Sequence, residues 1–174
     1  MTRMITEYHD YNDTCDIRLV DLKLDNLPAS IEVEGAKLYK KTEFHITLVS
    51  AKSVLRSIEG EPSLESLGDE IVEEFKKFIT ANQIKDYTLL PEFRLLKRGD
   101  SKTLVTMVKI DNNQKFFDLL REKYGAKIPD QPTHITIYSF DPETGLYINS
   151  AAELERDTHI VDVPELQNLA KIEP

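Results

Sequence analysis

Apolar residues recur three or four positions apart in two stretches of the chain, which is the spacing of one face of an α-helix. The first stretch follows Ser63, a residue type that often caps a helix N-terminus. The second follows Asn112 and Asn113, either of which can cap it, and ends at Gly125. The apolar positions are Leu64, Leu67, Ile71, Phe75 and Phe78 in the first stretch and Phe116, Phe117, Leu120 and Tyr124 in the second. The pattern predicts two amphipathic helices.

Shorter stretches alternate apolar and polar residues, as half-buried β-strands do. Residues 93–97 and 103–110 alternate on either side of Gly99-Asp100-Ser101, which predicts an antiparallel hairpin. Residues 17–24 mix two alternations, as a strand with a bulge or twist does. Further short strands, hairpins or helical turns are expected at 31–39, 146–148, 151–154 and 160–163, whereas residues 1–16 have no clear period and are expected to form an irregular arm.

The expected elements follow the order strands, helix, strands, helix, strands, which argues for an α+β fold with antiparallel sheets. A chain of 174 residues is long enough for one domain with a core of its own. No linker or change of composition divides the chain, so we expect a single domain over residues 1–174.

Composition is that of a soluble globular protein, with 40% hydrophobic and 30% charged residues. The longest apolar runs are far shorter than the roughly 20 residues needed to span a bilayer. The stretch from Met1 to Glu7 lacks the apolar segment of a secretion signal. Cys15 stands alone and cannot form an internal disulfide, which agrees with a reducing compartment. We therefore expect a cytoplasmic protein without a membrane partner, and a monomer is favoured.

The net charge of −9 disfavours binding along a long nucleic acid, because such binding depends on many contacts between Lys or Arg and phosphate. A short or small phosphorylated ligand fits this charge better. Basic residues do gather at some places, and each of them could equally be a solvated residue at a strand edge. They are Lys37, Lys40, Lys41 and Lys52 around residues 43–50, and Arg94, Lys97 and Arg98 on a later strand.

One short motif occurs twice, as Phe44-His45-Ile46-Thr47-Leu48-Val49-Ser50 and as Thr133-His134-Ile135-Thr136-Ile137-Tyr138-Ser139. Successive side chains of a strand point to opposite faces. The His and Thr of each copy are therefore expected on one face, and the intervening apolar residues are expected in the core. Strands are predicted at about 43–50 and 133–140.

A single histidine in an apolar strand is more often a hydrogen-bonded core residue than a catalytic one. From average residue usage, the chance that two of the four histidines precede Ile-Thr-apolar by accident is roughly one in a hundred thousand. Neither copy has the spacing of a metal-binding motif, so a metal site is not indicated. His9 and His159 lack the motif and are expected to lie outside the chemistry. The repeat therefore favours one functional site built from His45 and His134.

Two His-x-Thr-x motifs, separated by 89 residues from His45 to His134, resemble the signature of the 2H phosphoesterase superfamily. That superfamily includes bacterial RNA 2′,5′-ligase-like proteins, plant and yeast cyclic phosphodiesterases, and viral 2′,5′-oligoadenylate phosphodiesterases. The specific part of the resemblance is the eight residues His45 to Leu48 and His134 to Ile137. It implies a bilobal fold with a pseudo-two-fold axis, in which two small antiparallel sheets carry helices on the outside and the two motif strands face each other across a central groove.

Two imidazoles at one pocket can perform concerted general acid–base catalysis, because an unperturbed histidine titrates near about 6.5. The neutral histidine accepts a proton from the nucleophile, and the protonated one donates to the leaving oxygen. Thr47 and Thr136 are expected to donate hydrogen bonds to the phosphate, and neither a metal nor a cofactor is required. The sequence leaves open which histidine is the base. Tyr138 is a candidate for stacking on a base or ribose, and Lys41 is a weaker candidate for a phosphate contact.

We therefore expect a metal-independent phosphodiesterase that acts on a 2′,3′-cyclic phosphate or a 2′,5′-linked phosphodiester of RNA ends or small nucleotides. Two alternatives stay open. One is a nuclease that degrades cyclic oligonucleotide signals. The other is a binding module for nucleotides or RNA ends without turnover, although such a module has no need of two proton-transfer groups.

Overall fold

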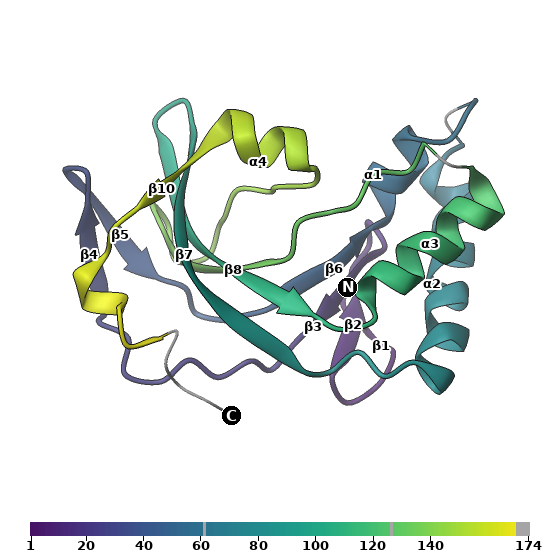
Figure 1. Cartoon of the computed structure of the whole chain (residues 1–174), viewed down its shortest axis with the longest axis horizontal. Helices are drawn as coiled ribbons and strands as arrows, with labels where there is room; N and C mark the ends of the chain where they lie inside the picture. The colour runs from purple at the N-terminus through teal and green to yellow at the C-terminus, as the bar shows by residue number, and fades with distance from the viewer. Residues whose placement is uncertain (61, 126, 170–174) are drawn as a thin grey trace.

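The computed structural model describes residues 1–60, 62–125 and 127–169 of the chain (Figure 1). Its strands are β1 (Arg3–Met4), β2 (His9–Tyr11), β3 (Asp16–Leu19), β4 (Ser30–Val33), β5 (Ala36–Lys40), β6 (Ile46–Ser50), β7 (Tyr87–Arg98), β8 (Ser101–Ile110), β9 (His134–Ser139) and β10 (Thr158–Val161). Its helices are α1 (Ala51–Arg56), α2 (Leu64–Ala81), α3 (Asn113–Tyr124) and α4 (Ala151–Asp157), followed by the 3-10 turn η1 (Pro164–Leu166).

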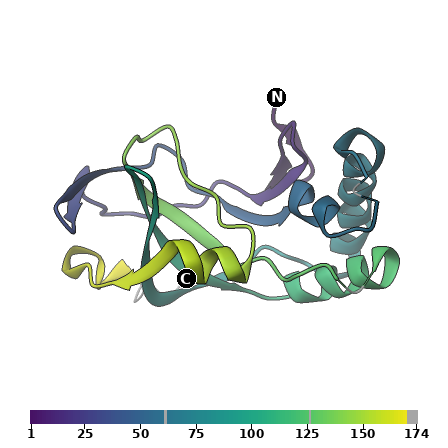
Figure 2. The same cartoon turned by 90° about the horizontal axis from the view of Figure 1, so that it is seen from above.

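The strands of the described residues form one antiparallel sheet in the order β1-β2-β3-β6-β9-β8-β7-β10. The β4–β5 hairpin joins this sheet through pairing of β5 with β9. Helices α1, α2 and α3 gather at one end of the molecule, whereas β4, β5, β10 and α4 lie towards the other end (Figures 1 and 2). The expected α+β fold with antiparallel strand pairing is confirmed. Within the described residues no helix is both long and apolar enough to cross a membrane.

The two motif strands, β6 and β9, are neighbours in the sheet and pair at Ile46 and Ile135. Two separate sheets were expected from the sequence, and the structure instead joins the strands into one sheet. Pairing of β6 with β9 gives hydrogen-bond partners to backbone N–H and C=O groups that would stay unpaired at the edges of two separate sheets. This junction is a single residue pair, so β1, β2, β3 and β6 on one side meet β9 and the strands beyond it, including the β4–β5 hairpin, at a narrow contact. The two motifs lie on either side of it.

Strand β6 contains a bulge immediately after Thr47, and it begins at Ile46, so His45 stands just before the strand that was predicted to include it. Arg18 of β3 lies opposite Thr47, but the preceding Ile17 lies opposite Val49. Leu48 is therefore an extra residue on β6. A bulge interrupts the alternation of side chains between the two faces of a strand, and Leu48, Val49 and Ser50 are all buried.

Strand β9 bulges at the corresponding position. Val105 of β8 lies opposite Thr136, but Leu104 lies opposite Tyr138, so Ile137 is the extra residue. The strict alternation predicted from the sequence therefore holds through Thr136 and then fails. The two copies of the motif share their residues and also this irregularity of the backbone.

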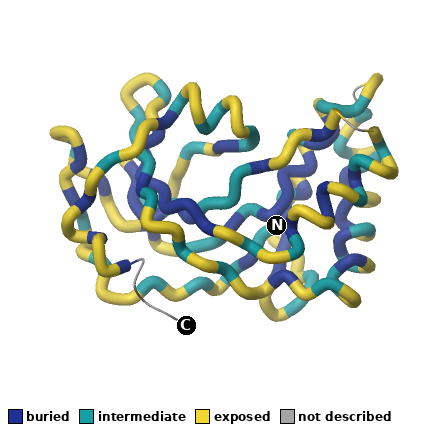
Figure 3. Tube along the Cα trace, in the orientation of Figure 1, coloured by how far each residue is buried: buried dark blue, intermediate teal, exposed yellow. Residues whose placement is uncertain are grey.

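The predicted helices are confirmed as α2 and α3. The Ser63 side chain accepts a hydrogen bond from the Ser66 backbone N–H at 3.2 Å and caps α2. Phe75 of α2 and Phe116 of α3 pack edge to face, with ring centroids 5.2 Å apart. Buried positions run through the central strands and the inner faces of these helices (Figure 3). The short helix α1 was not predicted, because six residues are too few to show a helical period.

Residues 1–16 are not the irregular arm expected from the sequence, because they contain β1 and β2 and pair with β3. Asp10 of β2 is buried and accepts two hydrogen bonds of 2.8 Å from the Arg18 guanidinium. His9 is buried as well, with Nδ1 2.7 Å from the Thr6 hydroxyl. Strands of two and three residues are too short to produce a recognisable alternation, so the sequence pattern missed them.

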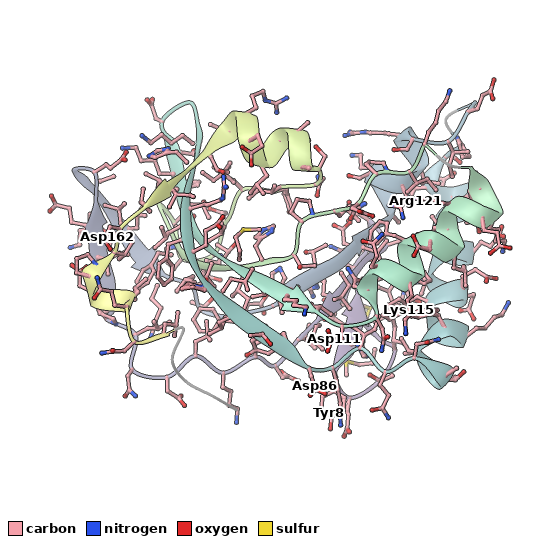
Figure 4. The ribbon with its side chains drawn as sticks, viewed as in Figure 1. Tyr8, Asp86, Asp111, Lys115, Arg121 and Asp162 are labelled. Carbon is pink, nitrogen blue, oxygen red and sulfur yellow. The ribbon has the colours of Figure 1, made fainter. Side chains whose placement is uncertain are left out.

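Removing the Phe116 ring should destabilise the fold. Phe116 is fully buried, and Phe→Ala in a core typically costs about 3–5 kcal/mol. We expect the free energy of unfolding of Phe116→Ala to fall by about that amount in urea titrations. The matched control is Lys115→Ala on the exposed face of the same helix (Figure 4), which should stay within about 0.5 kcal/mol of wild type. Equal losses in the two variants would contradict this account of the core.

Candidate active site

A cavity of about 510 Å³ opens where β6 and β9 meet. Its wall includes the two histidines and two threonines of the repeated motif, His45, Thr47, His134 and Thr136. Each of these side chains is partly buried, whereas Ile46 and Ile135 between them are completely buried. The structure thus brings together the residues that the sequence predicted as a single site.

The strand pairing sets the arrangement of the four polar side chains. Strand β6 begins at Ile46, so His45 stands immediately before it, whereas His134 is the first residue of β9. Each histidine precedes the paired isoleucine of its own strand, and in an antiparallel pair the two therefore lie on opposite sides of that pair. Both imidazoles line the same cavity, where a phosphate between them can contact both.

The imidazole of His134 contacts the backbone just before β9. Its Nδ1 lies 3.4 Å from the Pro132 carbonyl oxygen, which can accept a proton carried on Nδ1 and leave Nε2 as the acceptor for a ligand. The pKa of His134 is lowered to about 4, mainly by burial; the hydrogen bond to the Pro132 carbonyl acts against this effect, and the neighbouring His45 adds to it.

His45 has different surroundings. Burial lowers the pKa of His45 to about 4, and the positive charge of Arg18 is the second cause. Nδ1 of His45 is buried and has no hydrogen-bond partner among the described residues. The Glu43 carboxylate oxygen, 3.9 Å from this nitrogen, is too far for a hydrogen bond. The imidazole therefore carries one buried nitrogen that no described residue satisfies.

The low pKa values change one expectation from the sequence. Histidines with pKa values of about 4 are both neutral at neutral pH in the free protein, whereas the sequence argument assumed values near 6.5. An anion placed between them favours protonation of one, because an opposite charge within several ångströms stabilises the charged form. A phosphate ligand would thus bring the site to the state with one neutral and one protonated imidazole.

Arg18 is a site residue that the sequence analysis missed. It lines the cavity from β3, directly opposite Thr47. Its bidentate pair with Asp10 fixes the guanidinium beside His45. The signal in the sequence was a charged residue inside the apolar run from Ile17 to Val20, which also fits a solvated position at a strand edge.

Lys41 lines the cavity as the sequence suggested, but its ammonium group has another partner. Lys41 is buried, and its Nζ donates a hydrogen bond of 2.9 Å to the Thr144 carbonyl oxygen. Burial lowers the pKa of this ammonium group. Lys41 therefore anchors the loop that follows β9. A contact between its ammonium group and a ligand would come in addition to this hydrogen bond.

Tyr138 was predicted to stack on a ligand, and this prediction is wrong. Its side chain is completely buried, and its hydroxyl donates a hydrogen bond of 2.9 Å to the Pro28 carbonyl oxygen. The cause is the bulge at Ile137, which turns Tyr138 away from the face of Thr136. A buried ring of this kind belongs to the core.

A different tyrosine lines the cavity. Tyr147 lies on the loop after β9 and is 67% exposed. The same loop passes close to the motif at Gly145, where an added Cβ would lie 3.7 Å from the Thr136 methyl group. The alternation of strands could not identify Tyr147, because its position depends on the path of a loop.

The remaining histidines lie away from this cavity. His9 packs against Phe75 with ring centroids 5.5 Å apart, and His159 lies 2.6 Å from the Glu34 carboxylate. In residues 1–60, 62–125 and 127–169, no group of three or more His, Cys, Asp or Glu side chains is arranged to hold a metal ion. Comparisons with protein-family models, curated proteins and solved structures found no match to the chain.

The pKa values predict a pH dependence of stability. Between about 4 and the ordinary value near 6.5, the unfolded chain binds protons that the folded His45 and His134 do not, so stability rises with pH in this window. We expect the free energy of unfolding to fall as pH drops from about 6.5 towards about 4. His134→Gln should show a smaller fall in urea titrations over the same range. An NMR titration midpoint for His134 near 6.5 would contradict the explanation.

Proposed function

We propose that this protein is a metal-independent phosphodiesterase in which one of His45 and His134 acts as general base and the other as general acid on one phosphorus atom. The observation that supports this proposal best is the pairing of Ile46 with Ile135, which places the two His-x-Thr segments side by side in one cavity. The substrate class we propose is a 2′,3′-cyclic phosphate or a 2′,5′-linked phosphodiester of a small nucleotide or RNA end. We also propose a cytoplasmic setting, in keeping with the single Cys15.

The fold relation we propose is to the 2H phosphoesterase superfamily. The repeated motif supports it, and so does the matched bulge after each His-x-Thr, at Leu48 in β6 and at Ile137 in β9. A pseudo-two-fold relation between two halves of the chain would explain why both copies of the motif have the same backbone irregularity. The sheet of the described residues is continuous through the junction, so the halves would be parts of one sheet.

The chemistry follows from the side chains. One neutral imidazole takes a proton from the attacking oxygen, and the opposite imidazolium gives a proton to the leaving oxygen. The hydroxyls of Thr47 and Thr136 donate hydrogen bonds to the non-bridging phosphate oxygens, where negative charge is held. Burial lowers the pKa of both histidines in the free protein, and the negative charge of the substrate raises the pKa of a histidine beside it.

The alternatives differ in substrate or in turnover. A nuclease that degrades cyclic oligonucleotide signals would use the same four residues and a larger ligand. A binding module would keep the cavity without turnover, but it has no need of two groups that can transfer a proton. We therefore favour an enzyme.

Replacing either histidine should abolish turnover. Loss of general acid or base catalysis costs typically 10²–10⁴-fold, and groups that act as a unit do not add, so His45→Ala, His134→Ala and the double variant should be almost equally inactive. Thr47→Val and Thr136→Val each delete one hydrogen bond to a charged group, worth about 1.5–3 kcal/mol, and should be impaired but active. The assay measures initial rates on 2′,3′-cyclic nucleotides and 2′,5′-oligoadenylate in excess chelator.

The matched control for the histidines is His159→Ala, which removes an imidazole outside the cavity and should keep wild-type rates. Thermal melting of every variant separates loss of chemistry from loss of fold. Wild-type turnover by His45→Ala would end the proposal, and activity that disappears in chelator and returns with a divalent ion would move the case to metal catalysis.

Tyr147 should contribute to substrate binding. An exposed aromatic ring at the cavity can stack on a base, and such stacking is worth about 1–3 kcal/mol per base by alanine substitution. We expect Tyr147→Ala to raise KM for a nucleotide substrate with little change of Tm. Tyr39→Ala is the matched control, because Tyr39 is 42% exposed and does not line the cavity. Equal kinetics of Tyr147→Ala and wild type would remove Tyr147 from the site.

A further inference from the structure

A second cavity, of about 810 Å³, adjoins the candidate active site at His45. The two cavities share four wall residues, Arg18, Thr42, Glu43 and His45. The first cavity continues towards the loop of Tyr147, whereas the second continues towards the coil that follows β3. The segment from Thr42 to His45 thus lies between two compartments, and one of the two candidate catalytic imidazoles borders both.

The second cavity has an apolar wall. Val20, Leu22 and Leu24 line it from the coil after β3, and Phe44 lines it from the other side. All four side chains are partly buried, so each keeps some surface that a ligand can cover. Apolar walls that also carry a few polar groups are typical of sites that bind a small organic ligand.

The charges of this cavity disfavour a phosphate within it. Both nitrogens that Arg18 uses in its pair with Asp10 are 2.8 Å from a carboxylate oxygen, so its charge is largely compensated. The exposed carboxylates of Asp21, Asp25 and Glu43 also line the cavity, against the single ammonium of Lys23. Carboxylates accept hydrogen bonds from N–H and O–H groups. The compartment suits an uncharged group with such donors, as a nucleoside has on its base and ribose.

We propose that the second cavity holds the nucleoside on the leaving side of the scissile phosphate, so that the preferred substrate is an oligonucleotide with an internal phosphodiester and not a cyclic mononucleotide. This proposal rests on the proposed function. A new P–O bond forms to the oxygen of an attacking water molecule, which passes a proton to His134. The P–O bond to the nucleoside in the second cavity breaks, and that oxygen takes a proton from His45. The phosphate remains with the nucleoside in the first cavity.

The test fills the second cavity with Val20→Trp and compares two kinds of substrate. Dinucleoside monophosphates with a 2′,5′ or a 3′,5′ linkage need both cavities, whereas 2′,3′-cyclic AMP needs only the first. We expect wild-type protein to prefer one of the dinucleotides, and Val20→Trp to lower kcat/KM for that substrate by about tenfold or more, as loss of a bound base does. Hydrolysis of 2′,3′-cyclic AMP, which does not reach residue 20, should stay close to wild type.

Ala29→Trp is the matched control, since Ala29 is exposed and lines neither cavity. It should leave both activities unchanged. Calorimetry with the inactive His134→Ala protein gives a readout besides turnover, because adding Val20→Trp to it should weaken binding of the dinucleotide about tenfold.

Two results would contradict the proposed role of the second cavity while leaving the proposed function in place. One is equal loss on both kinds of substrate in a folded Val20→Trp protein, and the other is unchanged dinucleotide cleavage. A wild-type protein that hydrolyses none of these substrates above the level of His45→Ala would contradict the proposed function, and this inference with it.

Discussion

The candidate site depends on one contact, the antiparallel pairing of Ile46 with Ile135. Both side chains are completely buried, so the pairing is fixed by the core and not by the polar residues beside it. A shift of register by one residue would turn the histidines and threonines into the core and expose the isoleucines. The apolar residues of the motif thus determine where its polar residues point, which explains why the two kinds of residue alternate.

The matched bulges limit how far that alternation extends. In each motif strand an extra residue follows the threonine, so that the next side chains become part of the core. Tyr138 illustrates the effect, since its ring is buried and its hydroxyl satisfies the Pro28 carbonyl. The cavity is therefore polar over one short stretch of each strand and is closed beyond it by apolar packing. Bulges of this kind often stand beside functional sites, where they redirect a side chain.

The sequence predicted the parts of the fold that have a long or repeated pattern. Helices α2 and α3, the β7–β8 hairpin and the face shared by His45, Thr47, His134 and Thr136 follow from periodicity alone. The strands at residues 1–16, the helix α1 and the position of Tyr147 do not. These features depend on contacts between distant segments, such as the buried pair of Asp10 and Arg18, or on the path of a loop. A local pattern carries no information about such contacts.

The halves of the site share their motif but differ in what surrounds it. On one side, burial lowers the pKa of His45, and the positive charge of Arg18 lowers it in the same direction. On the other side, the Pro132 carbonyl lies beside Nδ1 of His134 and acts against the effect of burial on its pKa. When a ligand with one negative charge lies between the imidazoles, the two histidines respond to it from different electrostatic surroundings. The symmetry of the motif can provide two equivalent proton-transfer groups, but only the unequal surroundings can give each of them a separate role.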